Sequence, residues 1–138
     1  MFVMWVAKIK LKHDCIIGNR CESFKITLQS LDLAEKKQGN KIHTSSIHQL
    51  IGNEKNIKKF VNDLKKDKRA VHVELNGNTL FLVETAKRKP VSQFIRKNIF
   101  VTKPVVIDTR GIEHWEIASH KKEELMNFIK NVKHLIEE

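Results

Sequence analysis

The chain has 138 residues, of which 41% are hydrophobic and 30% charged, and its 26 basic residues exceed its 16 acidic residues to give a net charge of +10. This length allows one ordinary domain or two very small ones, and no apolar run approaches the ~20 residues that a membrane span requires. Two cysteines make no disulfide framework, so we expect a cytoplasmic protein, and the positive charge permits nucleic-acid binding without requiring it.

The first part of the chain predicts several strands. Residues 3–12 alternate apolar and polar side chains with period two, which is typical of a strand with one solvent-facing side. Residues 13–22 break this pattern and predict a loop or one short helical turn. Further strands are predicted over 24–29 and 42–51, with a turn at 38–40 between them.

A helix is predicted to begin after Asn53, which is a favourable N-cap, with Glu54 in the first turn. Four apolar residues then recur with helical spacing: Ile57, Phe60, Val61 and Leu64. This spacing is that of an amphipathic helix with one buried stripe. We expect the stripe to be buried against Ile9, Ile26 and Ile47.

The next strands are separated by a strong turn signal. A strand is predicted over 71–75, and Asn76-Gly77 after it is typical of a tight hairpin. Residues 80–83 form a nearly continuous apolar run, which predicts a strand buried on both faces.

Two helices and two strands complete the predicted elements. Pro90 is suited to the first turn of a short helix over 91–95. Strands follow over 105–107 and 112–118, joined by a turn at 109–111. The final helix carries an apolar stripe of six residues: Leu125, Phe128, Ile129, Val132, Leu135 and Ile136.

The order of these elements repeats. A strand, a short helical segment, two strands, a helix and a strand cover residues 1–76, and a second copy begins at Thr79 and stops after its last helix. This order is the ferredoxin-like pattern. We therefore predict an α+β fold of two tandem ferredoxin-like (βαββαβ, ACT-like) units at 1–76 and 77–138, the second lacking its last strand. The missing strand would leave an open edge beside strand 112–118, which predicts a homodimer.

Two segments carry a family resemblance. The segment 11–19, with the sequence Leu-Lys-His-Asp-Cys-Ile-Ile-Gly-Asn, resembles the opening signature of archaeal regulators of the bacterio-opsin-activator type, in which a strand ends in a basic-His-acidic-Cys segment before a short helix. The segment 103–111 followed by Trp115-Glu116 resembles the same family, in which a Pro-Val-Val strand and a turn precede an aromatic-rich strand and a long helix.

The resemblance covers the family's N-terminal, non-DNA-binding region. It implies a sensing half of a transcription regulator. The family's regulators end in a helix-turn-helix after a further strand, and this sequence stops before it. No segment here offers a helix, a short turn and a recognition helix in succession.

The segment His13-Asp14-Cys15, together with Cys21, is the candidate ligand or metal site. Thiolates beside an imidazole suit zinc or iron, but the spacing of the cysteines exceeds the usual C-x₂₋₄-C and no second pair follows. A redox-active pair would require the two Cα atoms to lie within ~7 Å. The favoured interpretation is two half-buried thiols at a helix start, and no metal or other cofactor is expected.

Catalytic motifs do not emerge from the sequence. The seven histidines are scattered, and His43 and His48 are an odd number of residues apart on one predicted strand, so they face opposite sides. The sequence contains no nucleophile elbow, phosphate loop or dinucleotide fingerprint. We therefore expect no enzymatic activity.

Two basic clusters remain as candidate nucleic-acid contacts. The first is on the predicted helix and its exit: Lys55, Lys58, Lys59, Lys65, Lys66, Lys68 and Arg69. The second is the favoured candidate: Lys87, Arg88, Lys89, Arg96 and Lys97, with Lys103 after it. The sequence has no tyrosine and no strand of the RNA-binding type, so a solvated basic surface is the simpler interpretation. Any nucleic-acid binding is expected to be weak and non-specific.

These observations predict a non-enzymatic sensing or protein-interaction module of an archaeal-type transcription regulator. The partner would be an unknown small-molecule or protein effector, and no membrane is involved. The alternatives are a stand-alone nucleic-acid-binding module that uses the basic clusters, and a metal or redox sensor at Cys15 and Cys21.

Overall fold

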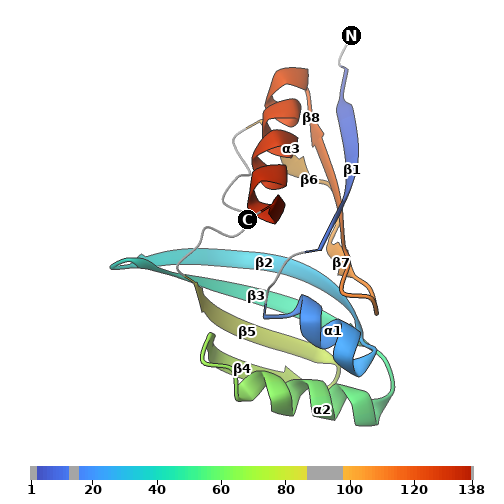
Figure 1. Cartoon of the computed structure of the whole chain (residues 1–138), viewed down its shortest axis with the longest axis vertical. Coiled ribbons are helices and arrows are strands. Elements are labelled where there is room, and N and C mark those ends of the chain that lie inside the picture. The colour runs from blue at the N-terminus through green and yellow to red at the C-terminus, as the bar shows by residue number, and fades with distance from the viewer. Residues whose placement is uncertain (1–2, 13–15, 87–97, 138) are drawn as a thin grey trace.

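The structure is a computed structural model that describes residues 3–12, 16–86 and 98–137, with side chains described as far as residue 133 (Figure 1). Its described part contains eight strands: β1 (Trp5–Leu11), β2 (Thr27–Gln38), β3 (Lys41–Ile51), β4 (Ala70–Asn76), β5 (Thr79–Ala86), β6 (Phe100–Val101), β7 (Val105–Ile107) and β8 (Glu113–Ser119). It also contains three helices: α1 (Gly18–Phe24), α2 (Glu54–Lys65) and α3 (Lys122–Glu137).

All eight strands belong to one antiparallel sheet. Its order is β1-β8-β7-β2-β3-β5-β4, and the short β6 pairs with β8. The sheet twists strongly, so that β2 to β5 run across the view of Figure 1 while β1 and β8 run nearly at right angles to them.

The three helices cover the same face of this sheet. Directly opposed residues of neighbouring strands share a face. The register joins Leu28 of β2 to Ile107 of β7, Ile107 to Glu113 of β8, and Glu113 to Leu11 of β1, and all four are buried. Because the buried residues that pack with α1, α2 and α3 lie on this side, we call it the helical face. The opposite side is the open face.

Two separate hydrophobic cores lie on the helical face. The first core packs α1 and α2 on β2, β3 and β5, and includes Phe60, Leu64 and Leu80. The second core packs α3 on β1 and β8, and includes Trp115 and Phe128. We call the corresponding parts the α1/α2 half and the α3 half.

Strand β7 joins the two halves. Its three residues pair with Leu28, Gln29 and Ser30 of β2, and its two helical-face side chains enter different cores. Ile107 belongs to the first core and Val105 to the second. The ladder between the halves is therefore only three residue pairs long.

Local sequence explains the predicted helix. The Asn53 side chain accepts a hydrogen bond from the backbone N–H of Asn56 at 2.8 Å, and Glu54 opens the first turn. The stripe of Ile57, Phe60, Val61 and Leu64 is buried as predicted. Its expected partners were only partly correct. Ile26 shares its core, whereas Ile9 packs in the second core and Ile47 lies on the open face, 37% exposed.

The predicted α+β class is confirmed, but the tandem ferredoxin-like units are not. A ferredoxin-like unit pairs its own four strands with one another, whereas β1 pairs with β8 and with no described strand of residues 1–76. Pairing also crosses the predicted boundary at residues 76 and 77, because β1 pairs with β8 and β4 pairs with β5.

The open edge predicted beside strand 112–118 is wrong. The observed strand, β8, has β1 on one side and β7 and β6 on the other. The chain's first described strand therefore supplies the neighbour that the sequence pattern lacked.

Two strand predictions require correction. Phe24, expected in a strand, ends α1, and Lys25 adopts the left-handed conformation (φ 55°) before β2 begins at Thr27. Strand β5 is buried on one face only. Leu80 and Leu82 are fully buried, whereas Phe81 and Val83 are half-buried on the open face, which no described element covers.

The predicted short helix over 91–95 lies outside the described residues. Within the described part, no helix is long and apolar enough to cross a membrane.

Candidate functional site

The structure describes only one residue of the candidate ligand or metal site. His13, Asp14 and Cys15 lie outside the described residues. Cys21 sits on α1 with no solvent exposure and packs in the first core. Among the described residues, no group of three or more metal-ligating side chains comes together. Such complete burial is typical of a core thiol rather than a reactive one.

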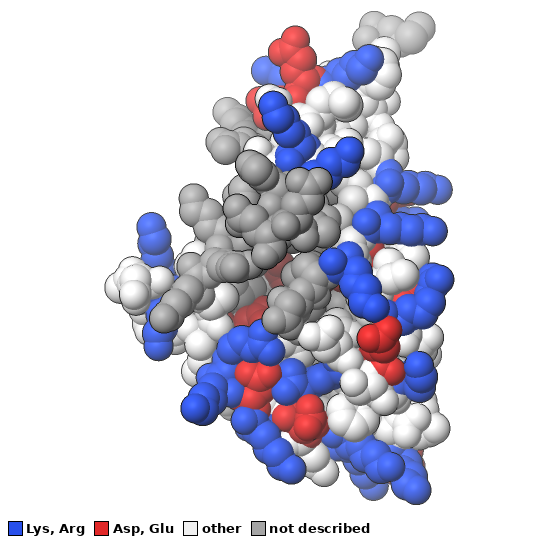
Figure 2. Space-filling view, in the orientation of Figure 1, with Lys and Arg blue, Asp and Glu red and all other residues white. Residues whose placement is uncertain are grey.

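The favoured nucleic-acid candidates Lys87, Arg88, Lys89, Arg96 and Lys97 also lie outside the described residues. The first basic cluster lies within the described residues. The lysines of α2 are exposed to solvent, as expected for the side of an amphipathic helix that lies opposite its buried stripe. Figure 2 shows basic side chains over the position of α2, at the bottom of the view, and along the margin of β1. Lys58 forms an ion pair with Glu54 at 3.5 Å on this exposed surface.

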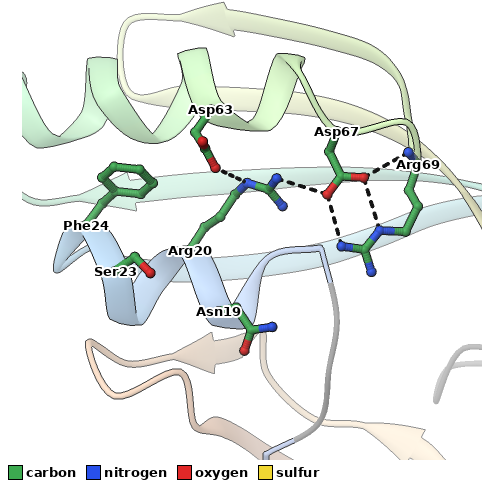
Figure 3. Close-up of a pocket in the computed structure, with 7 residues that line it drawn as sticks. All are labelled: Asn19, Arg20, Ser23, Phe24, Asp63, Asp67 and Arg69. Carbon is green, nitrogen blue, oxygen red and sulfur yellow. Dashed lines mark hydrogen bonds and ion pairs between the residues drawn. The ribbon is translucent and has the colours of Figure 1, made fainter.

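A polar depression with a volume of about 360 Å³ lies between α1 and the end of α2 (Figure 3). Seven residues line it: Asn19, Arg20, Ser23, Phe24, Asp63, Asp67 and Arg69. The charged members point toward one another rather than outward.

Arg20 is the centre of this cluster. Its Nε donates to Asp63 at 2.9 Å, its Nη2 pairs with Asp67 at 2.9 Å, and its Nη1 donates to the carbonyl oxygen of Ile16 at 2.7 Å. All three guanidinium nitrogens are therefore engaged. The side chain ties α1 to the C-terminal end of α2 and to the loop before β4.

Asp67 is saturated with donors. Its Oδ1 accepts from the backbone N–H of Arg69 at 2.9 Å and from Arg69 Nε at 3.1 Å, and its Oδ2 accepts from both guanidinium groups. The hydrogen bond from the Arg69 side chain is the main cause that holds the pKa of Asp67 well below its usual range. An ionised, fully bonded carboxylate is a poor proton donor or acceptor at neutral pH, so this cluster serves as a clamp between elements.

A second charged cluster closes the turn between β7 and β8. Asp108 accepts from the backbone N–H groups of Arg110 and Ile112, from the Arg110 side chain at 3.0 Å, and from His114 Nε2 at 2.8 Å. Burial alone would raise the pKa of Asp108. These hydrogen bonds outweigh it and hold the pKa well below its usual range. The bonds shape the turn in which Gly111 has a φ of 78°.

A buried polar cluster lies on the helical face of β2 and β3. His48 Nδ1 is 2.6 Å from the hydroxyl of Ser30, and its Nε2 is 2.8 Å from the hydroxyl of Ser46. All three residues are buried. Burial lowers the pKa of His48 from 6.5 to about 4, so the ring is neutral at physiological pH. The two serines satisfy both ring nitrogens, which is what a buried imidazole requires.

Sequence reasoning did not single out these three clusters. A signal for one of them was present. Ser46 and His48 have the same parity in their strand as Ile42 and Leu50, which places them on the buried face. The ion pairs of Arg20 join residues 43 positions or more apart and carry no local signal.

Comparison of the chain with family models, with curated proteins and with solved structures gives no match.

Proposed function

We propose that this chain is a non-enzymatic, cytoplasmic sensing and interaction module of an archaeal-type transcription regulator. The observation that supports the proposal best is the division of one sheet into two halves with separate cores. The halves meet in the sheet at β7, which places Val105 in one core and Ile107 in the other.

This architecture suits a population shift. A short ladder between two independently packed cores allows one half to loosen or rotate while the other stays folded. An effector that binds one arrangement more tightly than the other would shift the balance between them. The charged clusters fit this role, because the hydrogen bonds and ion pairs of Asp67 and Asp108 stabilise elements within each half.

The two tryptophans provide a test, because both lie in the α3 half. Trp115 belongs to the second core, and Trp5 of β1 lies under the ammonium group of Lys122 of α3, 5.0 Å from the ring centre. Tryptophan fluorescence therefore reports the α3 half, whereas far-UV circular dichroism reports the whole chain. Two-state unfolding requires the two signals to coincide.

We expect the fluorescence and circular-dichroism transitions in urea to have different midpoints. The two cores have no residue in common, so nothing requires the two halves to be equally stable. A difference of about 1 kcal/mol would separate the midpoints by about 0.5 M at a usual urea slope.

Two matched variants strengthen this test. Ile117→Ala removes a fully buried side chain of the second core and should shift mainly the fluorescence transition. Leu80→Ala does the same in the first core and should shift mainly the circular-dichroism transition. Coincident transitions in the wild type and in both variants would mean one cooperative unit and would remove the basis of the proposal.

The homodimer stays a prediction, with a different interface from the one the sequence suggested. Leu31, Ile47 and Phe81 lie side by side on the open face of β2, β3 and β5. Such an exposed apolar row favours association. We expect sedimentation velocity at high micromolar concentration to give twice the 16.1 kDa mass of the chain. Ile47→Asp should give the monomer, and Val71→Asp, at an exposed apolar position on β4, should not.

A further inference from the structure

Strand β1 ends the sheet with an outer edge that no described strand pairs. Figure 1 shows β1 at the margin of the molecule, with β8 on its inner side. The register with β8 is unbroken over seven residue pairs, from Trp5 opposite Ser119 to Leu11 opposite Glu113. A regular strand with an unpaired edge presents a row of backbone donors and acceptors to an added strand.

The opposite edge of the sheet is built differently. The register of β4 with β5 shifts between Ala70 and His72, an irregularity of the β-bulge type. Bulges twist an edge and interrupt its hydrogen-bonding row, which is a common protection against strand addition. Of the two strands that end the sheet order, β1 is therefore the one better suited to a partner.

The open face of β1 carries Val6 and two lysines, Lys8 and Lys10, and the cross-strand neighbours of the lysines are already occupied. Lys8 lies opposite Glu116, which accepts from Thr102 at 2.7 Å and pairs with Lys103 at 3.6 Å. Lys10 lies opposite His114, which is bonded to Asp108. Within the described part of the chain, neither lysine ammonium forms a hydrogen bond or an ion pair, although Lys8 lies in the field of Glu116.

The helical face of the same strand is apolar. Ala7 and Ile9 pack against the second core but remain half-buried, and Trp5 is 44% exposed. An added strand would cover these side chains on one face and meet the two lysines on the other. Successive residues of a strand point to opposite faces, so the partner's pattern follows directly.

We infer that the outer edge of β1 is a strand-addition site for an extended partner segment in which acidic and apolar residues alternate. The acidic side chains lie beside Lys8 and Lys10, and the apolar side chains beside Trp5, Ala7 and Ile9. This inference rests on the proposed function, since it names the class of effector that a sensing module of this shape would bind.

Charge decides against a second copy of this chain as the occupant. Another β1 would bring its own Lys8 and Lys10 to the same face, where like charges on paired strands are destabilising. Edge lysines discourage self-addition and at the same time favour an acidic partner.

The test uses a synthetic nine-residue peptide in which glutamate and valine alternate, with both ends blocked. It is titrated into ¹⁵N-labelled full-length protein, and backbone amide shifts are followed. We expect the largest shifts in β1, and weaker binding at higher salt because part of the affinity is electrostatic. A lysine–valine peptide of the same length should not bind.

Three controls decide the result. Lys8→Glu combined with Lys10→Glu should weaken binding at least tenfold, whereas Lys55→Glu combined with Lys59→Glu, the same charge change on α2, should not. Two N-methylated versions of the glutamate–valine peptide are prepared, one methylated at every glutamate and the other at every valine. The version whose methyl groups lie on the edge that pairs with β1 should lose binding. Shifts centred on α2, or affinity that is indifferent to both N-methylated peptides, would overturn the inference.

These outcomes are separable from those of the proposed function. If the halves unfold together, the sensing mechanism fails while the peptide still binds β1. If the halves unfold separately and the peptide causes no backbone amide shifts in β1, only the inferred strand-addition site fails. Where both hold, saturating peptide should raise the midpoint of the tryptophan transition more than that of the circular-dichroism transition, because it binds only the folded α3 half.

Discussion

Phe60→Ala should lower the free energy of unfolding by about 3–5 kcal/mol, the usual cost of removing a fully buried phenylalanine side chain. Phe60 has no solvent exposure, belongs to the first core, and meets the ring of Phe24 edge to face with centroids 6.4 Å apart. Because small domains are stable by only about 5–15 kcal/mol, this single change should bring the α1/α2 half close to unfolding. Urea titration followed by far-UV circular dichroism measures it.

Phe100→Ala is the matched control for this prediction. Phe100 is 47% exposed on the short strand β6, so Phe100→Ala should lower the free energy of unfolding by much less than Phe60→Ala does. A loss below about 1 kcal/mol for Phe60→Ala, or equal losses for both variants, would contradict the described packing of α2 on the sheet.

The second large effect is a loss of stability on mild acidification. The pKa of His48 is about 4 in the folded chain and 6.5 when the ring is solvated, so the unfolded chain binds a proton that the folded chain does not. The stability contributed by neutral His48 is therefore complete above pH 6.5 and is lost as pH falls toward 4. This difference between the two pKa values corresponds to a loss of about 3 kcal/mol in the free energy of unfolding.

His48→Gln isolates this contribution. The variant keeps polar atoms near Ser30 and Ser46 but has no titrating ring, so its stability should fall less between pH 6.5 and pH 4 than that of the wild type, whatever its starting value. His43→Gln, on the same strand but the opposite face, leaves the buried cluster intact and should keep the wild-type slope. Parallel pH profiles for His48→Gln and the wild type would show that the ring is not buried as described. Asp67 and Asp108 titrate below this window, because their pKa values are held low.

The sequence by itself determined the elements whose causes lie within a few residues. Helix α2 follows from the cap at Asn53 and a stripe with helical spacing, and both are found where they were predicted. The hairpin at Asn76-Gly77 and the turn at Gly111 follow from residues that tolerate positive φ, and both glycines adopt it. Such features need no distant partner, so a local pattern is sufficient to predict them.

Only the tertiary structure decided which strands are neighbours. Residues 5 and 119 pair although 114 positions separate them, and β1 takes the place that the sequence pattern left open beside β8. Period-two alternation shows that a strand has two faces but not which other strand lies beside it. An antiparallel partner can come from anywhere in the chain, because the choice depends on how the whole apolar surface is buried.

The candidate site divides along the same line. The parity of Ser46 and His48 could be read from the strand, whereas their bonding partner Ser30 depends on the pairing of β2 with β3. The clamp of Arg20 on Asp67 and the exposure of Lys8 and Lys10 at the edge of β1 depend on contacts between distant segments. The sequence determined the local conformations and the charge, and only the packing of the sheet decided which of those charges are neutralised and which remain exposed to a partner.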